Sequence, residues 1–285
     1  MRPAKRLIAW VWLVLPLALL LLMTLVFTLF DLDRTISGLF YRPGEGWFLS
    51  RQPLWQWLHR QGTIPGILLT LGCLLLWLAS HYFSHLSQWR KPCLVVVLTA
   101  VLAAGLLVNA VLKQYWGRPR PSQTIEYGGQ WEYRPIFPPG TPGKGASFPC
   151  GHCTMGFLFL ATAAFYPRSK SLAVAGVATG VVLGALLSAA RIVQGAHFTS
   201  DTLWSFGLII ATASGLMVWL PQTTAESAKE RSAAQRTKRF WLTLATLVVI
   251  LLMTAVFLTR RWAGGKIYHF PSSAVIDNFL QNLLF

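Results

Sequence analysis

The sequence is long enough for one or two domains, and its composition is that of a membrane protein. Of its 285 residues, 54% are hydrophobic and only 12% are charged, whereas soluble domains carry about 25% charged residues. The net charge of +16 would suit a nucleic-acid-binding protein, but the Lys and Arg residues lie between apolar runs and form no basic helix or cluster. Basic loops beside membrane spans explain this distribution, so we exclude nucleic acid as a partner.

Seven apolar runs predict membrane-spanning helices, because about 20 apolar residues cross a bilayer as a helix and backbone amides in lipid must be satisfied internally. The first run has 24 residues, which is too long for the apolar part of a signal peptide and predicts a retained span. The fourth and fifth runs are rich in Ala and Gly, which favours close helix packing. The predicted spans are residues 7–30, 64–83, 93–112, 153–167, 171–190, 202–220 and 240–259.

The distribution of basic residues predicts that the N-terminus lies inside. The inner segments would then be 1–6, 84–92, 168–170 and 221–239. They hold 12 of the 25 Lys and Arg residues, and the outer segments hold the other 13 over roughly three times the length. Because basic residues concentrate on the inner side of membranes, this orientation is favoured.

Two loops, 113–152 and 191–201, would emerge together on the outer face. The first is the longest connection in the chain and is rich in Gly, Pro and aromatic residues, and loops of that length are often functional. Polar residues that the ends of apolar helices do not require occur in three segments: Lys113 to Pro121 (KQYWGRPRP), Phe148 to Cys153 (FPCGHC) and Ala190 to Asp201 (ARIVQGAHFTSD).

These segments gather the groups that phosphoryl transfer needs. Arg grips phosphate oxygens with paired donors, Lys adds a point charge, and Gly151 lets a backbone N–H approach an anion. An imidazole can be the nucleophile of a covalent mechanism, and a carboxylate on its other nitrogen fixes the tautomer. His197 and Asp201 are four residues apart, which places them on one face of a helical turn. His152 can protonate the leaving oxygen and then activate water.

The three segments together resemble the motifs of the type 2 phosphatidic acid phosphatase (PAP2) superfamily, which shares its phosphate pocket with vanadium haloperoxidases. Lys113 with Arg120-Pro121 fits Lys, six residues, Arg-Pro. Pro149 to His152 is similar to Pro-Ser-Gly-His. Ala190 to Asp201 is similar to Ser-Arg, five residues, His, three residues, Asp.

The resemblance implies an all-α, polytopic membrane helix bundle, with a six-span core at about 64–220 and a seventh span. It implies that His197 forms a phosphohistidine, that Asp201 orients it, and that His152 is the general acid and then the base. It implies no metal and no cofactor. The residues it assigns to the phosphoryl group are Lys113, Arg120, Arg191, Gly151 and Cys150.

Two positions depart from the family pattern, since Cys150 and Ala190 each stand where Ser is usual. A thiol is a weaker donor than a hydroxyl, so we expect little hydrogen bonding to phosphate from the Cys150 side chain. Arg118 is expected to be an ordinary loop charge. His59 matches no motif and is expected to be an ordinary interfacial histidine.

A rival interpretation comes from Cys150 to Cys153, because CGHC is also the active-site tetrapeptide of protein disulfide isomerases. A low-pKa CxxC at a helix start is a redox device, which would make the protein a membrane thiol-disulfide oxidoreductase. No thioredoxin-like βαβ pattern surrounds the motif, and the sequence leaves open whether the two cysteines form a disulfide. A channel or transporter is disfavoured because the charges gather at one face, with almost none inside the spans.

The sequence therefore predicts one membrane domain over residues 1–285, with its motifs in 113–201. The predicted activity is hydrolysis of a lipid phosphate monoester or pyrophosphate at the periplasmic face of a bacterial inner membrane. Transfer of the phosphoryl group to another lipid is an alternative on the same site. The substrates considered are undecaprenyl pyrophosphate, phosphatidylglycerol phosphate, phosphatidic acid and lipid A phosphate groups.

Overall fold

The computed structural model describes residues 3–220, with side chains from residue 14 onward. The chain divides into two compact units, Met1–Ser232 and Ala233–Phe285, and every described residue belongs to the first. The seventh predicted span, 240–259, lies outside the described residues.

Within the described range the fold is helical, and the β structure there is confined to two isolated bridges, Arg42 with Gly46 and Thr124 with Trp131. Short helices of 3-10 or π type are labelled η. The elements are α1 (Pro3–Leu29), α2 (Leu32–Gly38), α3 (Pro53–Gln61), α4 (Ile64–Tyr82), η1 (Ser84–Trp89), α5 (Arg90–Thr99), η2 (Ala100–Leu112), α6 (Lys113–Tyr115), η3 (Pro121–Gln123), η4 (Ile125–Tyr127), α7 (Gly151–Phe157), η5 (Leu158–Phe165), α8 (Lys170–Val193) and α9 (Thr199–Trp219).

A helix occurs at each of the first six predicted spans, and four helical stretches are long and apolar enough to cross a membrane. A fifth arises if Val14–Leu29 and Leu32–Gly38, which meet at a bend of 67°, form one span. Gly151–Phe165, at the fourth predicted span, is a shorter apolar helix. The described chain thus has four or five membrane-crossing helices by length and composition, which fits a polytopic membrane protein.

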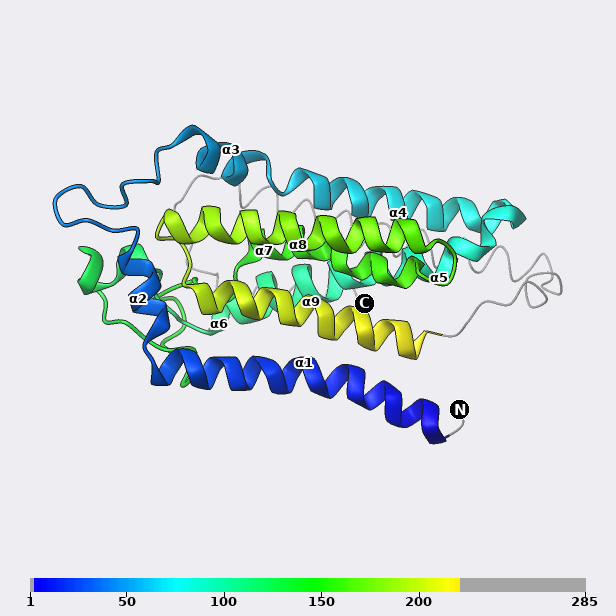
Figure 1. Ribbon diagram of the computed structural model, residues 1–285, viewed down its shortest axis with the longest axis horizontal. Coiled ribbons are helices and arrows are strands. Elements are labelled where there is room, and N and C mark those ends of the chain that lie inside the picture. The colour runs from blue at the N-terminus through cyan, green and yellow to red at the C-terminus, as the bar shows by residue number, and fades with distance from the viewer. Residues whose placement is uncertain (1–2, 221–285) are drawn as a thin grey trace, which may run out of the picture. The chain divides into compact units, whose positions relative to one another are not determined.

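The long helices run alongside one another, as Figure 1 shows. Helix α1 packs against α9, α4 against α5, and α8 against α7 and η5. The short helices α2, α3 and α6 lie toward one end of this arrangement (Figure 1), where α2 contacts α9 and α3 contacts α8. The sequence segments with clustered polar residues begin or end at that same end.

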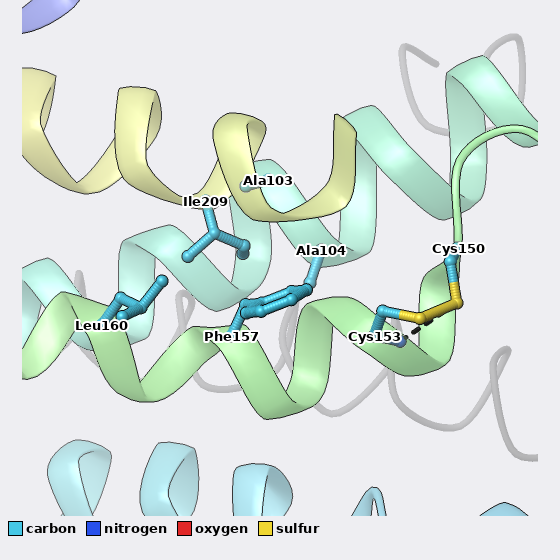
Figure 2. Packing of buried hydrophobic residues seen from close by; sticks show 7 residues of the cluster. All are labelled: Ala103, Ala104, Cys150, Cys153, Phe157, Leu160 and Ile209. Atoms are coloured by element: carbon cyan, nitrogen blue, oxygen red, sulfur yellow. Dashed lines mark hydrogen bonds between the residues drawn. A yellow bond between two sulfur atoms is a disulfide. The ribbon is translucent and has the colours of Figure 1, made fainter. Parts of the chain in front are cut away.

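Glycine allows α7 and α8 to pack closely, as their small-residue content predicts. A Cβ atom on Gly156 would lie 2.7 Å from Cα of Gly184, and one on Gly184 would lie 2.1 Å from the Phe157 ring. The core next to this contact is apolar and joins three helical stretches. Figure 2 shows its residues, which are Ala103, Ala104, Cys150, Cys153, Phe157, Leu160 and Ile209.

Candidate active site

His197 lies in the short loop that joins α8 to α9. The backbone N–H groups of Ala196 and His197 donate to the carbonyl of Arg191, at 3.0 and 3.3 Å, so the loop folds back on the last turn of α8. Gly195 makes this turn with a φ of 64°, and a Cβ there would lie 2.1 Å from the Trp47 ring. Both the left-handed backbone and the close indole require glycine at this position.

Asp201 lies in the first turn of α9 and faces the imidazole of His197. Its Oδ2 accepts hydrogen bonds from the Phe198 backbone N–H at 2.9 Å and from the Ser147 hydroxyl at 2.5 Å. The same oxygen lies 3.6 Å from Nδ1 of His197, which is long for a hydrogen bond. Within the described residues, Nδ1 of His197 is buried without a hydrogen-bond partner, so Asp201 is the acceptor that a small approach would supply.

The surroundings of His197 keep its imidazole neutral. Burial lowers the pKa of His197 to about 3, and the cations of Arg191 and Lys113 act in the same direction, while Asp201 partly opposes them. A neutral ring retains the lone pair that a nucleophile needs. Because Nδ1 faces the carboxylate, Nε2 is the nitrogen left for attack.

Three cationic side chains from separate segments, Lys113, Arg120 and Arg191, form an electrostatically linked cluster near His197. Lys113 follows the π-helix η2 and interacts electrostatically with Arg120 and Arg191. The segment that carries Arg120 is joined to the His197 loop, because the Ser122 N–H donates to the Gly195 carbonyl at 2.9 Å. Burial lowers the pKa of Arg120, and the charge of Asp201 opposes that shift. Such a group of cations suits a phosphoryl group.

Arg191, in the last turn of α8, has one side-chain N–H that donates to no described residue. Its Nη1 lies 2.8 Å from Oε1 of Gln194 and 2.7 Å from Nδ1 of His59. Its Nε is buried and has no hydrogen-bond partner among the described residues. A buried guanidinium N–H without a partner costs free energy, and a phosphate oxygen would satisfy it.

His152 enters the same cluster from the second residue of α7. It interacts electrostatically with Arg191, Lys113 and His197, and its ring centroid lies 5.0 Å from that of His59. The preceding residue, Gly151, allows the start of α7 to approach η2, since a Cβ there would lie 2.4 Å from Oδ1 of Asn109.

Cys150 is joined to Cys153 in a disulfide, and both are fully buried. The Cys153 N–H donates to the Cys150 sulfur at 3.3 Å, which caps the first turn of α7 (Figure 2). A disulfide sulfur carries no S–H, so the Cys150 side chain has no proton to donate to a phosphate. The backbone at this position holds the loop against α9, because the Ser205 hydroxyl donates to the Cys150 carbonyl at 3.0 Å.

Arg118 and His59, which were not expected to belong to the site, lie in this cluster. Arg118 is not a loop charge, because its side chain is 1% exposed and its Nη1 lies 2.5 Å from Oδ1 of Asp201. His59 is not an isolated interfacial histidine, because it contacts Arg191 and His152. Their partners are more than 80 residues away in sequence, so local spacing gave no signal of either contact.

No group of three or more His, Cys, Asp or Glu side chains within the described part of the chain is arranged to hold a metal ion. The charge of Asp201 acts on Lys113 and Arg120, but its two oxygens are already occupied by Arg118, Ser147 and the Phe198 N–H. The donor set around His197 is thus one of cations and imidazoles, which suits an anion.

Comparison with known proteins shows which proteins this chain is similar to. The PAP2 superfamily profile matches residues 94–226. The lipid A 4'-phosphatase of Francisella tularensis subsp. novicida is 30% identical over 177 residues, which cover 61% of this chain and 79% of that protein. The lipid A 4'-phosphatase of Rhizobium leguminosarum is 33% identical over 118 residues, covering 40% and 50%, and that of Rhizobium etli is 34% identical over 113 residues, covering 38% and 42%.

No solved structure is a significant match. The family profile and the relatives, together with the apolar helices, identify a membrane lipid phosphatase, which is a phosphoric ester hydrolase. The chain belongs to the PAP2 superfamily.

Proposed function

We propose that this protein hydrolyses a phosphate monoester of lipid A and releases inorganic phosphate, through a phosphohistidine at His197. The observation that carries this proposal is the cluster at His197. There a neutral, buried imidazole and an unpartnered Nε of Arg191 lie among Lys113, Arg120 and His152. The choice of lipid rests on the relatives, each of which is named a lipid A 4'-phosphatase.

In the first step, the Nε2 lone pair of His197 attacks phosphorus. The N–P bond forms while the bond from phosphorus to the sugar oxygen breaks, and that oxygen takes a proton from His152. A sugar alkoxide is a poor leaving group, so protonation by a positioned acid accelerates this step. The entering phosphate dianion favours the protonated form of His152, since an opposite charge stabilises an imidazolium.

In the second step, the neutral His152 takes a proton from water. The water oxygen attacks phosphorus, the N–P bond breaks, and its electron pair returns to Nε2 of His197. The products are inorganic phosphate and the dephosphorylated lipid. Asp201 stabilises the cationic ring that exists between the two steps, and the three cations hold the phosphoryl oxygens throughout.

The site faces the periplasm of a bacterial inner membrane in this proposal. The support is the concentration of basic residues in the segments predicted to lie inside. A membrane-impermeant thiol reagent should label Gln130→Cys in intact spheroplasts and should not label Ser84→Cys, because both positions are exposed and the proposed topology puts them on opposite sides of the membrane. If only Ser84→Cys is labelled, the proposed topology is wrong and the site faces the cytoplasm.

The buried disulfide weighs against the oxidoreductase alternative. Thiol-disulfide exchange needs a sulfur that a partner thiolate can reach, whereas Cys150 and Cys153 have no exposed surface. The phosphatase cluster also uses residues on which an oxidoreductase would not depend, among them Arg191 and His197.

The test is phosphate release by the purified protein from lipid A, phosphatidic acid, phosphatidylglycerol phosphate and undecaprenyl pyrophosphate. We expect lipid A to be hydrolysed with the highest kcat/KM, activity to persist in excess EDTA, and vanadate to inhibit as an analogue of five-coordinate phosphorus. His197→Ala should abolish release while the protein still folds. Activity that EDTA removes and Mg²⁺ restores, or a fully active His197→Ala, would contradict the proposal.

A further inference from the structure

A closed network of buried charges surrounds Asp201, the carboxylate that faces Nδ1 of His197. Arg118 is at its centre, where Nη1 lies 2.5 Å from Oδ1 of Asp201 and Nη2 lies 2.7 Å from Oδ2 of Asp33. The side chains of all three residues are at most 3% exposed. Burial lowers the pKa of Arg118, but the charges of Asp201 and Asp33 outweigh it and hold that pKa above its usual value.

Asp33 also holds the start of α9. Its Oδ1 accepts the backbone N–H of Ser200 at 2.9 Å, and its Oδ2 accepts the Ser200 hydroxyl at 2.5 Å. The residue that precedes α9, Phe198, has no capping side chain, so Asp33 supplies from a distant helix the acceptor that a helix N-terminus needs. A carboxylate at this end is also favoured by the helix dipole. His197 is two residues before α9, so its position depends on this anchor.

The chain makes a sharp turn to bring Asp33 to this place. Helix α1 ends at Leu29, Asp31 takes a left-handed backbone with φ 51°, and α2 starts at an angle of 67° to α1. Asp is among the few residues that adopt this conformation readily. The turn directs α2 against α9 and buries Asp33, while Asp31 remains partly exposed in an ion pair with Arg34.

The formal charges of the network determine what His197 experiences. Asp33, Arg118 and Asp201 together carry one net negative charge at neutral pH. If Asp33 were neutral, the charge of Arg118 would cancel that of Asp201, and no net negative charge would face the imidazolium that forms during transfer. The carboxylate of Asp201 would also be drawn toward Arg118 alone, because Arg118 would have lost its second partner.

We propose that Asp33 and Arg118 are positioning residues that fix the orientation and preserve the negative charge of Asp201. The N-terminal helix pair α1–α2 is therefore part of the active site, although the family profile begins at residue 94. This inference rests on the proposed role of His197 as the nucleophile. Neither residue touches the phosphoryl group in this account, so their effect falls on the chemical step.

The test compares Asp33→Asn with Asp31→Asn, which removes a carboxylate two residues away that has no contact with Asp201. In Asp33→Asn we expect kcat and the single-turnover rate of phosphohistidine formation to fall about 10- to 100-fold, the size of effect that misplaced catalytic groups produce. KM and the affinity for vanadate should change less than about threefold. Asp31→Asn should keep the parent values.

A second variant covers the case in which Asp33→Asn folds poorly because Arg118 is left without compensation. The double variant Asp33→Asn/Arg118→Gln removes both charges and should fold. Its kcat should exceed that of Asp33→Asn, because the double variant restores the single net negative charge, but should stay below that of the parent, because Asp201 has lost the donor that orients it. If either Asp33→Asn or the double variant folds and has the parental kcat, the inference is wrong but the proposed function still stands. A parent protein that forms no phosphohistidine would overturn the proposed function and this inference with it.

Discussion

Two groups of charged residues meet at His197, and they are held in different ways. The group behind the ring, on its Nδ1 side, is Asp201, Arg118 and Asp33, which are buried and joined by hydrogen-bonded ion pairs. The front group is Lys113, Arg120 and Arg191. Lys113 and Arg120 are only partly buried, and within the described residues no ion pair joins them to a carboxylate.

The difference separates two functions that a phosphatase needs. A network whose donors and acceptors are all satisfied fixes a geometry, because any displacement breaks a buried hydrogen bond. In the front group, Nε of Arg191 has no hydrogen-bond partner among the described residues, so it remains available to bind an incoming anion. We therefore expect substitutions in front of His197 to affect both binding and rate, and substitutions behind it to affect rate alone.

The largest effect on the front group should come from Arg191→Gln, because Arg191 is the cation with a buried, unpartnered N–H. We expect kcat/KM to fall at least about 100-fold, as when one donor to a transition-state oxyanion is removed, with a clear rise in KM. Arg168→Gln, in the turn that precedes α8, is the matched control and should stay near the parent value. A rise in kcat, or an unchanged KM, would mean that Arg191 does not grip the phosphate.

Acid should destabilise the parent protein more than His197→Gln. Burial holds the pKa of His197 at about 3, against the ordinary value of 6.5. Between these values the unfolded chain binds a proton that the folded chain does not, so stability is complete above pH 6.5 and falls as the pH drops toward 3. The loss is about 1.4 kcal/mol per pH unit.

Melting temperatures in detergent at pH 7 and pH 5 measure this effect. The parent should lose about 2 kcal/mol more than His197→Gln over that interval, by the same relation. Equal losses in the two proteins would show that His197 is protonated in the folded state at pH 5, and therefore that its imidazole is exposed to solvent.

A smaller effect is expected from His59, whose Nδ1 accepts a hydrogen bond from Nη1 of Arg191 at 2.7 Å. His59→Ala removes one hydrogen bond and should raise KM about 3- to 10-fold, in line with the net contribution of a single bond. His59→Gln keeps a polar partner and should recover most of the loss. If KM is unchanged and only kcat falls in His59→Ala, His59 belongs with the positioning group behind His197.

The smallest effect should come from the disulfide. Replacing both cysteines, as Cys150→Ser with Cys153→Ala, should leave phosphate release within about threefold of the parent, because a lost neutral contact weighs less than a lost charge. The variant and the parent should both lack disulfide-exchange activity on a reduced, unfolded protein. Exchange activity that Cys150→Ser removes, in a parent without phosphatase activity, would restore the oxidoreductase interpretation.

The sequence predicted the long helices, the front group and Asp201, but it did not predict the two other members of the group behind, Arg118 and Asp33. Apolar runs as long as a bilayer is thick locate α4, α8 and α9 without any knowledge of their neighbours. Lys113, Arg120 and Arg191 could be recognised because their spacing follows a family pattern. Cys150 was recognised as a departure from that pattern.

Arg118 and Asp33 could not be recognised in this way, because their roles arise from contacts across 83 to 85 residues of sequence and from a bend between α1 and α2. The same reason hid His59, whose partner Arg191 is 132 residues away. A charge in a loop is usually solvated, but Arg118 is buried in contacts with Asp33 of α2, with Asp201 of α9 and with the Phe198 ring. The bend depends on the backbone of Asp31, which no periodicity of apolar residues indicates.

The most direct test of the account is detection of the covalent intermediate. The protein is incubated with radiolabelled lipid A, quenched at alkaline pH where phosphohistidine survives, and digested for peptide mapping. His152→Ala, which lacks the base for the second step, is mapped in parallel with an aryl phosphate whose leaving group needs no acid. The account predicts label on His197 in both, with more accumulation in His152→Ala and none in His197→Ala. Label on another residue, or rapid phosphate release without any labelled peptide, would contradict it.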